Sequence, residues 1–151
     1  MLGLYYEDYE VGKEIISVGR TITEADVVTF GTLTGDLNPL HMDAEFAAKD
    51  SFGQRIAHGK LGESIMVGLM SDIIQGSVVA FLGSTTQFKL PVFLGDTVHL
   101  EYKCANKRLT KKGDKGIVNL DMNLVNQRNE VVTHSQFDFM VYVKEKDTRE
   151  K

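Results

Sequence analysis

The feature that most constrains the fold is a change of hydrophobic period at Gly76. Before it, apolar residues recur every four positions from Leu61 to Ile73, and a second apolar stripe runs beside them. This pattern predicts a helix whose apolar face is wider than a surface helix needs. After it, apolar and polar residues alternate in successive stretches, as in half-buried strands. One buried helix followed by four strands predicts an α+β domain, with an antiparallel sheet packed around the helix.

The four stretches after Gly76 are expected to form a meander. Val79 to Lys89 is apolar on both faces in places, which is typical of a central strand. The other three stretches each direct one apolar set toward the core: Val98, Leu100, Tyr102 and Cys104; Val118, Leu120, Met122 and Leu124; and Phe137, Phe139, Val141 and Val143. Glycine- and asparagine-containing turns separate them, as a meander requires.

The first sixty residues have a different pattern. Gly12 to Ile22 alternates and is expected to form a strand. Thr23 followed by Asp26 predicts the capped start of a helix that runs to about Leu33. A second, short helix is expected over 44–49, with Asp43 as its N-cap.

Composition narrows the class of protein. The 151 residues are 42% apolar and 25% charged, which fits one globular domain over 1–151, with a frayed charged tail at 144–151. The net charge is −4, and no basic run exceeds two residues, so no nucleic-acid partner is expected. Cys104 is the only cysteine, which excludes an intrachain disulfide and a cysteine-based zinc site. An acidic start and no long apolar segment predict a cytoplasmic protein without a membrane partner.

The polar segment from Phe30 to Asp43 is the strongest functional candidate. Asp36 and His41 lie five residues apart across a stretch that Gly35 loosens and Pro39 stiffens. A rigid bend that holds one acid and one imidazole suits acid–base chemistry on a small substrate. On spacing alone, the simpler interpretation is that Asp36 makes a turn or cap and that His41 is a hydrogen-bonded loop histidine.

A second candidate lies at the start of the buried helix. Gly59 could be a glycine that is merely tolerated at a helix start, or its free N–H could face an oxyanion at the positive end of the helix. His58 could assist such a site, although a histidine before a helix more often caps it or packs against its neighbours. The roles of both residues therefore stay open at this point.

The string Gly-Asp-x-Asn-Pro-Leu-His at 35–41, followed by His58-Gly59, resembles the hydratase 2 motif of the MaoC-like, (R)-specific enoyl-CoA hydratases. The resemblance covers nearly the whole chain and implies a hot-dog fold. It also implies that Asp36, His41 and Gly59 are catalytic, that Asn38, His58 and Gly59 contact the substrate, and that Asn38 shapes the loop as well. The backbone amide of Gly59 is then expected to hold the thioester carbonyl.

The resemblance further implies addition of water to a trans-2-enoyl thioester, or the reverse dehydration. The expected partner is a substrate carried on CoA or acyl carrier protein, without any cofactor or metal. Relatives pair their sheets edge to edge, so a homodimer or an oligomer of dimers is expected. His41-Met-Asp43 with Asp36 offers only one good donor for a soft metal, which argues against a metal site.

Three residues depart from the family pattern. Arg55 stands where relatives often have proline, Glu63 where small apolar residues are usual, and Val67 where some relatives have a serine that supports the acid. None of them is part of the Asp36–His41 pair, and they bear on acyl-chain specificity and on the hydrogen bonding of Asp36. Because a fold does not fix a function, two alternatives remain, a non-catalytic acyl-thioester binding module and a hot-dog thioesterase. Acyl-chain length, the choice between CoA and carrier protein, and the division of labour between Asp36 and His41 stay open.

Overall fold

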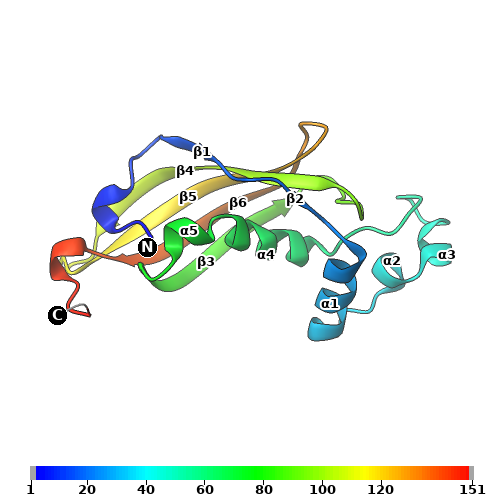
Figure 1. The fold of residues 1–151 in the computed structure, drawn as a ribbon, viewed down its shortest axis with the longest axis horizontal. Helices are drawn as coiled ribbons and strands as arrows, with labels where there is room; N and C mark the ends of the chain where they lie inside the picture. The colour runs from blue at the N-terminus through cyan, green and yellow to red at the C-terminus, as the bar shows by residue number, and fades with distance from the viewer. Residues whose placement is uncertain (1–2, 150–151) are drawn as a thin grey trace.

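The computed structural model describes residues 3–149. An antiparallel sheet curves around a central helix, and a group of shorter helices lies beyond one end of that helix (Figure 1). The sheet has the order β1-β4-β5-β6-β3, and β2 also pairs with β4. Its strands are β1 (Glu14–Ile16), β2 (Arg20–Thr21), β3 (Val78–Phe88), β4 (Thr97–Leu109), β5 (Lys115–Asn126) and β6 (Val131–Tyr142).

The helices precede the meander in the chain. They are α1 (Glu24–Thr34), α2 (Pro39–Met42), α3 (Ala44–Ala47), α4 (Gly59–Leu69) and α5 (Ser71–Ile74), with short 3-10 helices η1 (Tyr6–Asp8) and η2 (Lys144–Lys146). The expected capping box is present, because Asp26 N–H donates to the Thr23 hydroxyl and Thr23 N–H donates to the Asp26 carboxylate. Asp43 caps α3 as expected, with its carboxylate accepting from two backbone N–H groups.

The core lies between α4 and the concave face of the sheet. Leu61, Ile65 and Met66 of α4 are buried there, and the three apolar sets expected from alternation are buried opposite them. Burial of each large side chain contributes about 1.5–3 kcal/mol to folding. The periodic pattern therefore identifies both layers of the fold, which confirms the α+β prediction.

Three expectations about the elements need correction. The helix expected through Ile73 breaks at Met70, where φ is −109° and ψ is 13°, so α4 and α5 are separate. The Gly12–Ile22 strand forms only as the short β1 and β2, and Ile16 and Val18 are exposed. In the charged tail at 144–151, expected to be frayed, Lys144–Lys146 form η2, and residues 150–151 lie outside the described residues.

The position of β3 was also predicted wrongly. It lies at the edge of the sheet, and within residues 3–149 it pairs with β6 alone. Phe81, Leu82 and Phe88 on this strand are 51%, 47% and 49% exposed. In the single chain, β3 therefore has an open edge with exposed apolar side chains beside it.

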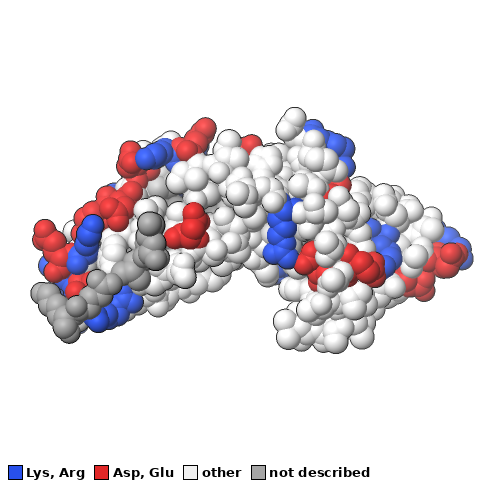
Figure 2. Space-filling model, in the orientation of Figure 1, with Lys and Arg blue, Asp and Glu red and all other residues white. Residues whose placement is uncertain are grey.

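The two ends of the molecule contain different elements. Helices α1, α2 and α3 lie together beyond the N-terminal end of α4, whereas the two ends of the described chain meet near α5 (Figure 1). On the face in Figure 2, charged side chains gather over the two ends, and the middle is largely uncharged. The candidate segment from Phe30 to Asp43 therefore lies at the end of the molecule away from the ends of the described chain.

Candidate active site

Helix caps build the loop that carries the acid and the imidazole. α1 ends at Gly35, whose φ of +79° is in the left-handed region that glycine adopts readily. Asn38 caps α2, since its side-chain oxygen accepts from Leu40 N–H, and Pro39 occupies the first helical position. Asp36 is thus placed between two helix termini, and His41 on the short helix α2. The sequence predicted an irregular loop here and missed α2.

The imidazole of His41 is held on one side by the backbone of Ile56. Its Nδ1 lies 2.8 Å from the carbonyl oxygen of Ile56, which can only accept. Nδ1 therefore carries the hydrogen, and Nε2 keeps a lone pair for another partner. The imidazole is half-buried, so it is both fixed and reachable.

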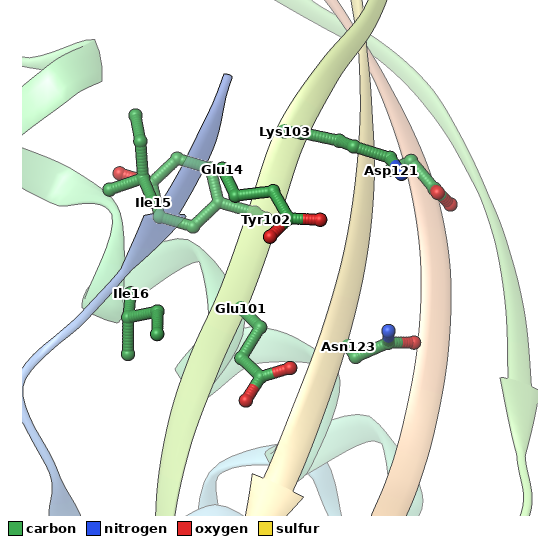
Figure 3. A pocket seen from close by; sticks show the side chains of 8 residues that line it. All are labelled: Glu14, Ile15, Ile16, Glu101, Tyr102, Lys103, Asp121 and Asn123. Atoms are coloured by element: carbon green, nitrogen blue, oxygen red, sulfur yellow. The ribbon is translucent and has the colours of Figure 1, made fainter. Parts of the chain in front are cut away.

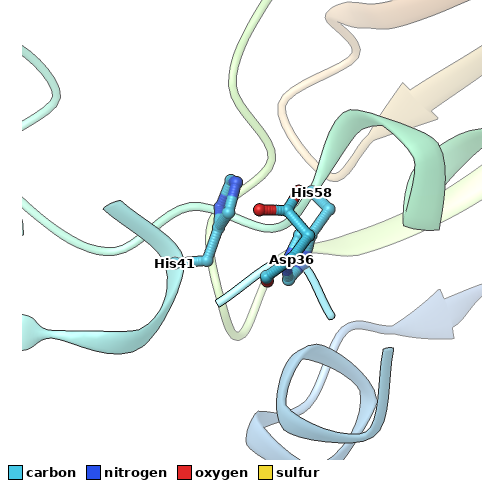
Figure 4. A group of neighbouring side chains, drawn as sticks. All are labelled: Asp36, His41 and His58. Atoms are coloured by element: carbon cyan, nitrogen blue, oxygen red, sulfur yellow. The ribbon is translucent and has the colours of Figure 1, made fainter. Parts of the chain in front are cut away.

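The carboxylate of Asp36 is exposed and lightly engaged. Its Oδ1 accepts a long bond of 3.4 Å from Asn38 N–H. One carboxylate oxygen of Asp36 and one ring nitrogen each of His41 and His58 all lie within 4.8 Å of one another (Figure 4). The structure therefore brings together the expected acid and imidazole, and adds the second histidine to them.

His58 is 3% exposed and is the N-cap residue of α4. Its Nε2 donates to the backbone oxygen of Asp36 at 2.9 Å. Its ring stacks on His41, with centroids 3.9 Å apart and planes 31° apart, and it also packs against Phe30 at 5.1 Å. The expected contact between His58 and substrate stays a prediction, because the buried side chain touches the loop.

The three donor groups are poorly arranged for a metal ion. A ring nitrogen binds a metal along a lone pair that lies in the plane of its ring. The His41 and His58 rings are stacked with a small angle between their planes. Their lone pairs therefore cannot converge at the about 2.0–2.1 Å that a zinc–histidine bond requires unless a ring turns.

Gly59 opens α4 as its first helical residue. The first N–H groups of a helix have no partner within it, and the dipole is positive at this end. A Cβ added at Gly59 would lie 3.0 Å from two carbons of the Phe88 ring. Gly59 therefore combines a potential oxyanion donor with a tight contact to β3, and the structure supports both interpretations.

Arg55 supports the loop from the opposite side. Its Nε donates to the backbone oxygen of His41 at 2.5 Å, and its guanidinium pairs with Glu24 at 2.8 Å. The sequence identified Arg55 only as a departure from the family pattern. No sequence signal joins Arg55 to His41, 14 positions away, or to Glu24, 31 positions away, so this support could not be predicted.

Glu63 lies one turn after Gly59 and is 8% exposed. Its carboxylate accepts from Lys60 at 2.6 Å, from Ser84 at 2.8 Å and from Thr86 at 2.7 Å. Burial raises the pKa of this carboxyl, but the three hydrogen bonds outweigh it and hold the pKa below the ordinary value. Glu63 therefore ties α4 to β3 through a polar network beside the start of the helix.

A separate hollow of about 220 Å³ lies on the sheet and contains none of the motif residues (Figure 3). Side chains from β1, β4 and β5 line it, including Glu14, Glu101 and Lys103. No histidine is among the residues that line this hollow, in contrast to the space around Asp36 and His41.

Comparison with known proteins gives a consistent picture. Residues 8–126 match the family described as MaoC like domain. The 3-hydroxybutyryl-CoA dehydratase of Methylorubrum extorquens is 38% identical over 103 residues, which are 68% of this chain and 64% of that protein. The (R)-specific enoyl-CoA hydratase of Aeromonas caviae is 36% identical over 121 residues, which are 80% of this chain and 87% of that protein.

The fold is shared with solved structures. An Archaeoglobus structure described as a monoamine oxidase regulatory protein has a TM-score of 0.86 and 34% identity, covering 95% of this chain and 97% of its own. The antiparallel sheet around α4 is the hot-dog fold, which confirms the expected architecture. Within residues 3–149, no helix has the length and apolar character needed to span a membrane.

Proposed function

Because this chain belongs to the MaoC-like domain family, whose members include hydratases and dehydratases, we propose that it is an (R)-specific 2-enoyl thioester hydratase. In reverse the same site would dehydrate a 3-hydroxyacyl thioester. One observation carries the proposal: an exposed carboxylate, on Asp36, and an imidazole, on His41, lie close together beside His58 at the N-terminus of α4.

The proposed reaction adds water across a conjugated double bond. The oxygen of the water molecule bonds to the β-carbon, and the thioester oxygen then carries the negative charge of an enolate. A proton is afterwards delivered to the α-carbon. Asp36 and His41 would hold the water and take its proton, since both present acceptors to it. A proton returned from this pair to the α-carbon balances the addition.

The enolate oxygen needs a donor that is already in place. Gly59 N–H at the start of α4 fits this role, because the first N–H groups of a helix have no partner within it and the helix dipole favours negative charge there. Loss of one such donor typically lowers the rate by about 10²–10³-fold. Glycine also leaves room for the thioester, which a side chain at this position would crowd.

The substrate handle is proposed to be CoA or an acyl carrier protein. Among the relatives are proteins named for each, including the Aeromonas caviae enoyl-CoA hydratase and an acyl-carrier-protein dehydratase of Solanum lycopersicum that is 32% identical. We also propose a homodimer formed through the open β3 edge, with the site near the subunit boundary.

A regulatory, non-catalytic thioester-binding module is the second candidate, because a structure described as a regulatory protein shares 34% identity. The discriminating experiment adds crotonyl-CoA and follows enoyl absorbance and free thiol together. Loss of absorbance without thiol release supports a hydratase, and thiol release indicates a thioesterase. Binding without either change would support the regulatory module and contradict the proposed function.

A further inference from the structure

His58 touches three parts of the candidate site at once. Its Nε2 bonds the backbone of Asp36, its ring stacks on His41, and its peptide bond leads directly into Gly59. The side chain is 3% exposed, so it offers little surface to a substrate. The ring also packs against Phe30, but these three contacts end on residues with a proposed chemical role, which sets His58 apart from an ordinary core histidine.

The hydrogen bonds determine where the ring hydrogens lie. The Asp36 carbonyl oxygen can only accept, so Nε2 of His58 carries the hydrogen. Nδ1 of His58 is buried and has no hydrogen-bond partner within residues 3–149. A bare lone pair there is tolerated better than an unpaired N–H, so the ring is the Nε2-protonated tautomer. His41 is the opposite tautomer, with its hydrogen on Nδ1.

The neighbouring helix leaves room for this arrangement. A Cβ added at Gly31 of α1 would lie 3.1 Å from the Asp36 carbonyl oxygen and 3.5 Å from Cε1 of His58. The absence of a side chain at Gly31 therefore lets α1 pack directly over the bond between His58 and Asp36. The bond is enclosed between α1 and the start of α4.

We propose that His58 is a positioning residue, which fixes the Asp36 backbone through Nε2–H and the His41 ring through stacking. The inference rests on the proposed function, since it assigns His58 to the alignment of the acid and the imidazole against one substrate. Misplacement of a reacting group by about 1 Å can lower a rate by 10²-fold, so such alignment is worth measuring.

Three variants separate the two contacts. His58→Gln keeps an N–H donor near the place of Nε2 but has no ring, whereas His58→Phe keeps the ring but has no donor. His58→Ala loses both, and we expect its kcat for crotonyl-CoA hydration to fall about 10²-fold with KM nearly unchanged. Each conservative variant should recover part of that loss. His99→Gln on the outer face of the sheet is the matched control, with kcat unchanged.

Two kinetic outcomes would overturn the proposal. A higher KM with unchanged kcat would make His58 a substrate-binding residue. Unchanged kcat per folded molecule, with a lower melting temperature, would make it a packing residue only. If His58→Ala does not fold, the Gln and Phe variants decide between these outcomes and the proposed one.

A second readout does not depend on activity. Long-range ¹H–¹⁵N spectra of the full chain should show the hydrogen of His58 on Nε2 and that of His41 on Nδ1. The His41 signals should change in His58→Gln and stay close to wild type in His99→Gln. The opposite tautomer at His58, or unchanged His41 signals, would overturn the positioning role. An inactive wild type with the expected spectra would instead contradict the proposed function alone.

Discussion

Arg55 holds His41 by its backbone: Nε of Arg55 lies 2.5 Å from the carbonyl oxygen of His41. The same guanidinium pairs with Glu24 on α1, so one side chain connects the two helices on either side of Asp36. The Arg55 side chain is 16% exposed and that of Glu24 is 62% exposed. The bond to His41 is therefore the better shielded of the two.

This difference in exposure predicts unequal effects of substitution. Glu24→Ala should lower the free energy of unfolding by only about 0–1 kcal/mol, as expected for an exposed ion pair. Arg55→Ala should lower it by about 1–3 kcal/mol, because a charged hydrogen bond to a backbone oxygen is lost. It should also lower kcat several-fold, because His41 is less firmly placed. Equal effects in urea unfolding and kinetics would show that the ion pair, and not the bond to His41, matters.

Glu63 predicts a pH dependence of stability. Its pKa in the folded chain is below the ordinary 4.5, so its network stabilises the fold fully above that value. The contribution is lost as pH falls below 4.5 toward the lowered folded pKa. Urea unfolding of wild type and Glu63→Gln should therefore differ most at neutral pH and converge in acid. A difference that stays constant with pH would show that the charge of Glu63 does not contribute.

Much of the fold was predictable because its signals repeat along the chain. The alternation in β4, β5 and β6 continues over many residues, and each apolar set is buried as expected. The break at Met70 was not predictable, since it depends on a single backbone conformation within a continuous apolar pattern. The edge position of β3 was missed because apolar residues on both faces occur in central strands and in edges that pair with another chain.

The candidate site was predictable only where its residues are close in sequence. Asp36 and His41 share one loop, and the motif around them predicts their proximity. The stacking of His58 on His41 and the bond from Arg55 to His41 depend on how segments more than ten residues apart pack together. Residue spacing carries no signal for such contacts.

A substitution at Gly59 tests whether this residue is an oxyanion donor or only a glycine required for packing. Gly59→Val should lower the free energy of unfolding by about 1–3 kcal/mol, because the new side chain overpacks against Phe88. It should lower kcat/KM by about 10²-fold, because the side chain keeps the thioester carbonyl away from the N–H. The new side chain would press on the half-exposed Phe88 ring, so Phe88→Leu is the matched relief variant. The double variant should regain stability and stay nearly inactive. Recovery of activity in the double variant would show that Gly59 only makes room for Phe88.

The open β3 edge predicts an assembly in solution. Light scattering should give at least twice the 16.8 kDa mass of one chain. Leu82→Lys places a charge on the exposed edge and should weaken the assembly, because lysine discourages strand pairing. Lys107→Gln, on β4 away from this edge, should leave the mass unchanged. A stable and fully active wild-type monomer would contradict pairing through β3.

The most direct test of the acid–imidazole pair is the rate of crotonyl-CoA hydration by Asp36→Asn, His41→Ala and their double variant. Each single variant should lower kcat by about 10²–10⁴-fold while remaining folded. The double variant should be little worse than the poorer single one, since residues that act as a unit are not additive. Retention of more than about a tenth of the wild-type kcat by either folded single variant would contradict the account.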